Sequence, residues 1–134
     1  HPYEYIHNEL GYNFRMPNLN AALACAQLEQ LNSFLKKKRK LAKSYEVFFK
    51  KKGIKFRTET IETKANYWLM CVELENSKER DLFLKSTNAC HVMTRPIWKP
   101  MDTLPMYKEC QTDELRNTRF LEERIVNIPS SVIL

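Results

Sequence analysis

The sequence predicts an α+β domain in which one small sheet carries helices on one face and follows a long N-terminal helix. Two observations predict this class. Apolar residues recur at helical spacing through a first segment of the chain, and short segments rich in β-branched and aromatic residues then alternate with two further helical segments. At 134 residues with 43% hydrophobic content, the chain can bury a core without disulfides.

The first helix follows a loop. Residues 1–17 are polar and aromatic and are punctuated by a glycine and a proline, which predicts a structured loop. The helix is predicted from Asn18, a good N-cap, to about Lys52, before the C-terminal stop Gly53. Its apolar positions over 19–35 exceed what one small sheet can cover. We therefore expect part of this face to pack against another domain or a second subunit.

Strands and a second helix are predicted next. Residues 54–57 are a short strand candidate, and 66–75 (NYWLMCVELE) a stronger one because aromatic and aliphatic side chains dominate it. Ser77 begins a segment that resembles a capping box and predicts a helix ending near Asn88. The aromatic pair that opens the stronger strand, Tyr67 and Trp68, is expected in the core.

The C-terminal third is predicted to alternate between regular and extended structure. Residues 90–94 (CHVMT) have the character of a strand, whereas three prolines make 95–107 extended and irregular. A third helix is predicted over 112–123 and a last strand over 124–128, directly before Pro129.

Composition excludes several kinds of site. The four cysteines form no CxxC pair and have no histidine at ligand spacing, so no metal site is expected. Two glycines in the whole chain exclude a glycine-rich phosphate loop. No apolar run approaches the roughly 20 residues of a membrane-spanning helix, so no membrane partner is expected. Free cysteines without a signal peptide indicate a cytoplasmic protein.

The positive charge is concentrated on the first helix. Of 22 Lys+Arg and 16 Asp+Glu in the chain, nine basic residues and one acid lie between Lys36 and Lys52. One interpretation is a binding module that docks nucleic acid through this helix. The other is a solvated helix face, which we favour because the run lacks interleaved aromatic residues and no base-reading motif accompanies it.

The loop before the first helix has the donors of an anion site. Asn13 can donate amide hydrogen bonds to a phosphate, Arg15 can grip an anion with two parallel donors, and the helix start adds a favourable dipole. The alternative is that Asn13 stabilises its own turn and Arg15 is a surface residue. His7 and His91 are expected to be structural.

Several segments together resemble one family. They are HNELGYNFRMPNLNAALACAQLEQL, KRKLAKSYEVFF, NYWLMCVEL, TRPIWKPM, LPMY and IVNIPSS. They resemble the C-terminal part of the DegT/DnrJ/EryC1/StrS family of nucleotide-sugar aminotransferases, which use pyridoxal phosphate. The resemblance covers essentially the whole chain, and its C-terminal motifs look most like the branch that serves legionaminic-type acids. Another branch of the family, such as a perosamine-type or a lipid-A-modifying sugar aminotransferase, is the alternative.

The resemblance implies how the chain is organised. It implies a fold type I enzyme in which residues 18–134 form the C-terminal small domain, with a mostly antiparallel sheet and a linking helix over 18–52. Residues 1–17 form a loop that reaches the cofactor. Members are homodimers, and Asn13 maps onto the asparagine that binds the partner's cofactor phosphate. Arg15 lies beside it on the substrate side.

The resemblance also implies a reaction. An amino group passes from L-glutamate to a nucleotide-linked 4-keto-6-deoxy sugar, for surface polysaccharide or nonulosonic acid biosynthesis. The family places the lysine that holds the cofactor on a large domain upstream of His1. No catalytic residue is therefore expected in this chain, which opens without an initiator methionine and is expected to be a piece of a longer protein, inactive alone.

A second candidate site lies in the proline-rich segment. The Arg95 guanidinium has paired N–H donors that suit the diphosphate of a nucleotide sugar, and the Trp98 indole has a flat apolar face that suits its rings. The alternative is that Trp98 fills a corner of the core while Arg95 pairs with an acid such as Glu73 or Glu75.

Overall fold

The computed structural model describes residues 11–12 and 14–132, and the chain divides into two units, His1–Asn32 and Ser33–Leu134. Helix α1 (Asn18–Lys51) begins in the first unit and ends in the second. Its start agrees with the prediction, and it ends one residue before the predicted Lys52. The predicted domain boundary at residue 17 stays a prediction.

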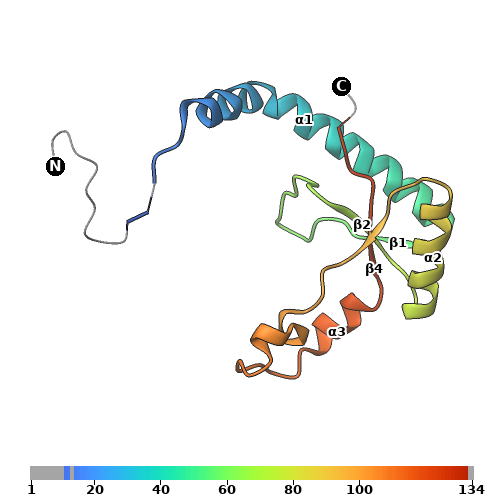
Figure 1. Cartoon of the computed structure of the whole chain (residues 1–134). Helices are drawn as coiled ribbons and strands as arrows, with labels where there is room; N and C mark the ends of the chain where they lie inside the picture. The colour runs from blue at the N-terminus through green and yellow to red at the C-terminus, as the bar shows by residue number, and fades with distance from the viewer. Residues whose placement is uncertain (1–10, 13, 133–134) are drawn as a thin grey trace. The chain divides into compact units, whose positions relative to one another are not determined.

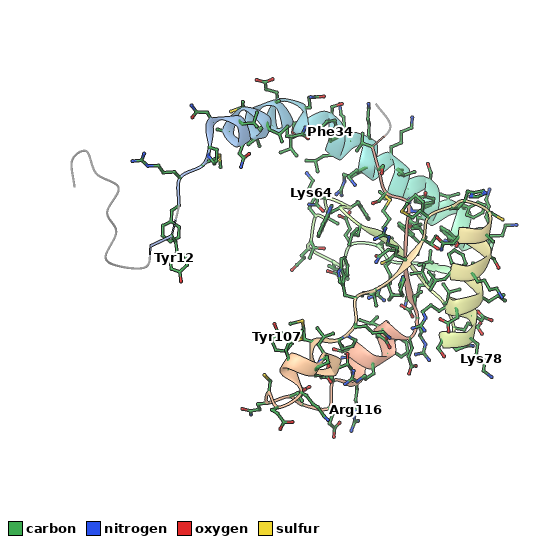
Figure 2. All side chains as sticks on the ribbon, viewed as in Figure 1. Tyr12, Phe34, Lys64, Lys78, Tyr107 and Arg116 are labelled. Carbon is green, nitrogen blue, oxygen red and sulfur yellow. The ribbon has the colours of Figure 1, made fainter. Side chains whose placement is uncertain are left out.

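The first unit exposes its large apolar side chains. The described residues before α1 have no regular secondary structure, and Phe14 is 91% exposed, with its ring centroid 6.2 Å from that of Tyr12. Figure 2 labels Tyr12, whose side chain projects away from the ribbon. Along α1, Leu19, Leu23 and Leu28 are also exposed. The expected surplus of apolar surface over 19–35 is therefore present.

The second unit is built on a four-stranded antiparallel sheet with the order β1-β2-β4-β3. Figure 1 labels β1, β2 and β4 of this sheet. The strands are β1 (Lys55–Phe56), β2 (Met70–Glu73), β3 (Arg95–Pro96) and β4 (Ile125–Ile128). The central pair β2 and β4 aligns Val72 with Val126, both fully buried. The predicted sheet is confirmed.

Helices α1 and α2 pack on one face of this sheet. Side chains alternate between faces along a strand, so Met70 and Val72 point to the same face. There they join one buried cluster with the second half of α1, and α2 (Ser77–Ala89) contributes partly buried side chains to it. The buried members of the cluster are Ala42, Phe49, Phe56, Met70, Val72, Leu74, Val126 and Ile128. The predicted layer of helices on one face is confirmed for α1 and α2.

The stronger strand is shorter than predicted. Tyr67 has a φ of 52°, and the Trp68 backbone N–H donates to Asn66 Oδ1 at 2.9 Å, which turns the chain before β2 begins at Met70. Trp68 is 69% exposed, so its predicted core position is wrong. Tyr67 is partly buried and packs against the core, as expected.

Residues 90–94 do not form the predicted strand. They turn the chain from α2 toward β3, with His91 at φ 60° and the Val92 backbone N–H donating to Thr87 O at 2.9 Å. Thr94 is buried, and its hydroxyl group is satisfied there by hydrogen bonds to the Thr87 hydroxyl at 2.6 Å and the Asn88 side-chain amide at 3.0 Å. These bonds to α2 take the place of strand pairing.

The extended segment after β3 contains two short 3-10 turns, η1 (Met101–Thr103) and η2 (Pro105–Tyr107). Helix α3 spans only Arg116–Glu122 instead of the predicted 112–123, because Leu115 before it has a left-handed backbone at φ 47°. None of the helices in the described part of the chain combines the length and apolar character needed to span a bilayer.

Candidate functional site

Arg95 and Trp98 line the same pocket, of about 570 Å³, at the β3 edge of the sheet. Strand β3 carries Arg95, and the extended segment after it carries Trp98. The full lining is Leu69, Met93, Arg95, Pro96, Ile97, Trp98, Asn127, Ile128, Pro129 and Ser130. The structure thus brings together the two residues predicted for the second site, and their role in binding stays a prediction.

The strand register places this pocket on the face opposite α1 and α2. Arg95 pairs with Asn127, which in turn pairs with Cys71. Paired residues project to the same face, and Cys71 alternates with the core residues Met70 and Val72. Arg95 and Asn127 therefore project away from the helical layer, toward the face that α1 and α2 leave open.

Both alternatives considered for this pair are wrong. Trp98 is 67% exposed, so it does not fill a corner of the core. Glu73 forms its ion pairs with Lys55 and Arg57, at 3.1 and 3.0 Å. Within the described residues no acidic side chain forms an ion pair with Arg95, whose guanidinium contacts Met93 Sδ at 3.8 Å. A cation and an aromatic face therefore meet at one opening.

One wall of the pocket is tied to α1 by Lys38. Its ammonium donates to the carbonyl oxygens of Ser130, Tyr67 and Trp68 at 2.7, 3.1 and 3.3 Å. Burial lowers the pKa of Lys38 from its usual value. One ammonium thus joins two strand ends that are far apart in the sequence, and one of its carbonyl partners belongs to the pocket lining.

Further hydrogen bonds hold the same wall. The Tyr45 hydroxyl donates to Pro129 O at 3.0 Å, and the Ser130 hydroxyl donates to Trp68 O at 3.0 Å. Burial raises the pKa of Tyr45. Because α1 supplies both Lys38 and Tyr45, the position of residues 129–130 is fixed from the helical layer.

The sequence analysis missed Lys38 because it lies inside the basic run. A signal was present, since Lys38, Ala42, Tyr45 and Phe49 follow one another at offsets of four, three and four, which places them on one helix face. That face packs on the core. A lysine at such a position extends its amine past the apolar layer to reach polar groups at the edge.

Arg39, like Lys38, does not belong to the solvated face predicted for the basic run, because its side chain is partly buried and paired. Its guanidinium binds both carboxylate oxygens of Glu59, at 2.7 and 3.0 Å, contacts Ala65 O, and lies 5.7 Å from the centre of the Tyr67 ring. The pKa of Glu59 is lowered, first by the Ala65 backbone N–H and then by Arg39. Most other lysines of the run are exposed, as expected for a solvated face.

The predicted anion site is described in part. Asn13 and His7 lie outside the described residues. Arg15 is exposed just before α1, and the first turn of α1 has no acidic side chain. His91 is exposed in the turn after α2. No group of three His, Cys, Asp or Glu suited to a metal occurs among the described residues.

Comparison with known proteins finds one matching family and several related sequences. The model of the DegT/DnrJ/EryC1/StrS aminotransferase family matches residues 2–134. The GDP-perosamine synthase of Escherichia coli O157:H7 is 34% identical over 110 residues, which cover 79% of this chain and 29% of that protein. The chain therefore spans about a third of the length of such relatives.

Solved structures share the fold. PseC of Helicobacter pylori, an aminotransferase involved in the biosynthesis of pseudoaminic acid, has a TM-score of 0.80 at 18% identity, covering 95% of this chain and 33% of that one. The Escherichia coli GDP-4-keto-6-deoxy-D-mannose-3-dehydratase with bound hydrated PLP has a TM-score of 0.75 at 18% identity, covering 98% and 35%. These likenesses confirm the predicted fold class.

The comparisons identify the family but not a branch within it. The relatives include a GDP-perosamine synthase, so the comparisons do not single out the predicted legionaminic-type branch. Nothing in the comparisons supports the alternative of a module that docks nucleic acid. Because the family model matches nearly every residue, the chain belongs to the DegT/DnrJ/EryC1/StrS aminotransferase family.

Proposed function

We propose that the chain is the C-terminal part of a cytoplasmic, pyridoxal 5'-phosphate-dependent aminotransferase. The enzyme would move an amino group from L-glutamate to a nucleotide-linked 4-keto-6-deoxy sugar, for surface polysaccharide or nonulosonic acid biosynthesis. Support comes from family membership and from relatives named for sugar amination. The four cysteines are free, which suits a reducing compartment.

One observation carries the proposal at the level of residues. Arg95 and Trp98 line one pocket at the β3 edge of the sheet, and Lys38 and Tyr45 of α1 bind the carbonyl groups of Ser130 and Pro129 in the same lining. A guanidinium can bind the diphosphate of a nucleotide sugar, and an indole face can pack against a sugar or base ring. These two side chains would bind and orient the substrate.

The segment before α1 has donors that fit the cofactor phosphate. Asn13 brings an amide, Arg15 a guanidinium, and the first turn of α1 has no carboxylate to repel an anion. We assign cofactor binding to Asn13 and substrate binding to Arg15. Pyridoxal phosphate, when bound, supplies the electron sink through which amino groups are transferred. The lysine that holds it is proposed to lie outside this chain, which would be inactive alone.

The proposed enzyme is a homodimer. Phe14, Leu19, Leu23 and Leu28 are large apolar side chains exposed in the first unit, and large exposed apolar surface is typical of interfaces. A second copy that covers them would place Asn13 and Arg15 of one subunit at the site of the other.

The test uses the full-length protein loaded with pyridoxal phosphate. L-Glutamate is expected to remove the visible absorbance of the bound cofactor, and a GDP-linked or UDP-linked 4-keto-6-deoxy sugar to restore it with formation of the amino sugar. Failure of every nucleotide-linked keto sugar to restore the absorbance would overturn the proposal. The GDP and UDP arms decide which nucleotide the enzyme takes.

Variants test the assigned residues. Arg95→Ala is expected to raise the KM for the sugar substrate at least tenfold and to leave the glutamate half-reaction within twofold, because a charge-assisted hydrogen bond is lost only from the sugar complex. Arg116→Ala, at an exposed position outside this pocket, is the matched control. An unchanged KM in Arg95→Ala would remove Arg95 from the site.

The asparagine assignment needs its own pair of variants. Asn13→Ala is expected to weaken binding of pyridoxal phosphate by about tenfold, because a donor to its phosphate is lost. Asn20→Ala, in the exposed first turns of α1, serves as the control. Equal cofactor affinity in both variants would show that residue 13 does not contact the phosphate.

A further inference from the structure

The pocket at the β3 edge includes chain that lies beyond the ends of β2 and β4. Residues 68–69 precede β2 and residues 129–130 follow β4, and we call these four residues the strand extensions. Three of them, Leu69, Pro129 and Ser130, line the pocket. The pairing of β2 with β4 ends before them. This part of the lining therefore depends on other contacts for its position.

Side-chain hydrogen bonds replace a strand pair between the extensions. The register of β2 and β4, when continued, places Trp68 opposite Ser130. The Trp68 backbone N–H donates to Asn66 Oδ1 at 2.9 Å, which takes it away from Ser130 O. Instead, the Lys38 ammonium donates to Ser130 O at 2.7 Å and to Trp68 O at 3.3 Å, and the Ser130 hydroxyl donates to Trp68 O at 3.0 Å.

Lys38 holds both extensions from a fixed helix. Tyr45 of the same helix donates to Pro129 O at 3.0 Å and so reaches the extension after β4. Ala42 and Phe49, on the same face of α1, are buried in the core, so the stem of Lys38 starts from a well-packed position. Loss of the ammonium would free both extensions at once and leave the apolar core in place.

The charge of this region suits an anionic ligand. The lining of the pocket contains the Arg95 guanidinium and no carboxylate. Within the described residues Lys38 donates to carbonyl oxygens and forms no ion pair with an acidic side chain. Two cations in or beside the pocket therefore keep a positive potential that attracts a diphosphate.

We propose that Lys38 is a positioning residue for the nucleotide-linked sugar. It holds the strand extensions at the spacing that completes the pocket of Arg95 and Trp98. The inference rests on the proposed function and adds to it a residue that acts on the substrate through the backbone of Trp68 and Ser130. Without the ammonium the extensions separate, so the sugar substrate binds less tightly although Arg95 is still present.

The test uses steady-state kinetics of the full-length protein loaded with pyridoxal phosphate. The substrates are L-glutamate and the GDP-linked or UDP-linked 4-keto-6-deoxy sugar that the parent protein aminates. Lys38→Met is expected to raise the KM for the sugar at least fivefold and to leave the KM for glutamate within twofold, because displaced binding groups weaken only the ligand that they contact.

Three variants separate positioning from loss of stability. Lys43→Met, the same change at an exposed position of α1, is expected to leave both KM values within twofold. Phe56→Leu loosens the core at the opposite edge of the sheet, outside the pocket lining, and is expected to do the same. Lys38→Arg keeps a charged donor group, so its KM for the sugar is expected to be at least twofold below that of Lys38→Met.

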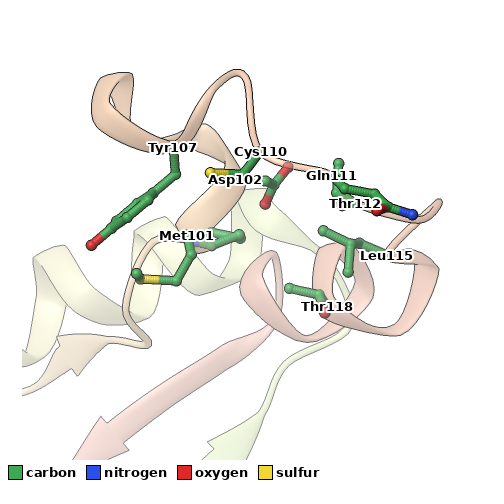
Figure 3. Close-up of a pocket in the computed structure, with 9 residues that line it drawn as sticks. Met101, Asp102, Tyr107, Cys110, Gln111, Thr112, Leu115 and Thr118 are labelled. Carbon is green, nitrogen blue, oxygen red and sulfur yellow. The ribbon is translucent and has the colours of Figure 1, made fainter.

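A thiol outside the pocket reports general loosening of the domain. Figure 3 shows Cys110 in a second pocket, of about 380 Å³, in which Asp102 is ion-paired with Arg119 of α3. This second pocket shares no lining residue with the pocket at the β3 edge. Cys110 is exposed, and its rate of labelling by a maleimide, resolved by peptide mass spectrometry, is expected to stay within twofold in Lys38→Met.

The outcomes are separable. The inference is overturned by an unchanged KM for the sugar in Lys38→Met, by an equal rise in the KM for glutamate or in Phe56→Leu, by a KM in Lys38→Arg as high as in Lys38→Met, or by faster labelling of Cys110. If Arg95→Ala raises the KM for the sugar and Lys38→Met does not, the inference falls and the proposed function stands. If the parent protein aminates no nucleotide-linked sugar, the proposed function falls and this inference falls with it.

Discussion

Replacement of Lys38 by methionine is expected to lower the free energy of unfolding by about 2 kcal/mol. The ammonium donates to three carbonyl oxygens, of which Tyr67 O and Ser130 O are partly buried and Trp68 O is exposed. Water and the Ser130 hydroxyl can satisfy the exposed oxygen, so the loss comes from the two partly buried ones. A hydrogen bond to a charged group contributes about 1.5–3 kcal/mol, and desolvation of the ammonium, which lowers its pKa, offsets part of that gain.

Urea-induced unfolding, followed by circular dichroism, measures this change. Methionine keeps the apolar stem, so the comparison isolates the ammonium. Lys43→Met is the matched control, because Lys43 binds Glu46 on the same helix at 2.7 Å, makes no other hydrogen bond within the described residues, and is largely exposed. We expect the control to differ from the parent protein by less than about 0.5 kcal/mol.

Amide hydrogen exchange adds a local measurement. In Lys38→Met, exchange at Ser130 and Ser131 is expected to quicken more than at Val72 in the core, because the wall of the Arg95 and Trp98 pocket loses its tie to α1. Equal stabilities for the Lys38 and Lys43 variants, or unchanged exchange at residues 130–131, would refute the argument that this ammonium holds the wall.

Three further predictions concern the core, the loop after β1 and the cap of α2. Met70→Ala is expected to cost roughly 2–5 kcal/mol in urea unfolding, because the side chain is 1% exposed, and Met106→Ala less than about 0.5 kcal/mol; similar costs would place Met70 outside the core. The folded pKa of Glu59 lies below its unfolded value, so its stabilisation is present at neutral pH and is lost as the pH falls through the folded pKa. The protection factor of the Ala65 amide, which is the ratio of its intrinsic exchange rate to its measured rate at the same pH, should therefore fall with acid, and Glu59→Gln should remove that fall. Asn76→Ala is expected to cost about 1 kcal/mol, since Asn76 Oδ1 accepts the Glu79 backbone N–H at 3.0 Å; no change would mean that water caps the helix equally well.

Local patterns predicted the helices of the fold better than its short strands. The start of α1 at Asn18 could be predicted because capping residues and helical spacing act within a few positions. The start of α2 was predicted to within one residue, but its N-cap is Asn76 and not Ser77, because Asn76 Oδ1 accepts the Glu79 backbone N–H. The segment 90–94 alternates like a strand, yet it forms a turn because Thr87 and Asn88 bind Thr94. Contacts of that kind depend on how α2 meets the sheet, which no local pattern encodes.

In the candidate site, too, residues close together in the sequence could be predicted as partners, whereas contacts between distant residues could not. Arg95 and Trp98 could be proposed as partners because they lie three positions apart in a stiff segment, and the structure places them at one pocket. Helical spacing puts Lys38 on the core-facing side of α1, but the partners of Lys38 and Asp102 could not be predicted, since they lie far along the chain. Lys38 reaches Ser130, and Asp102 reaches Arg119. Charge and spacing alone do not show which members of a basic run turn inward.

The composition of β3 limits how the sheet can grow. This strand lies at one edge, and the Ile97 backbone N–H points inward to Ile125 O at 3.4 Å. Backbone N–H directions alternate along a strand, so the outward-facing position at this edge belongs to Pro96, which has no N–H. A foreign strand that approaches from this side finds no donor there, so proline protects this edge against intermolecular β-pairing and aggregation.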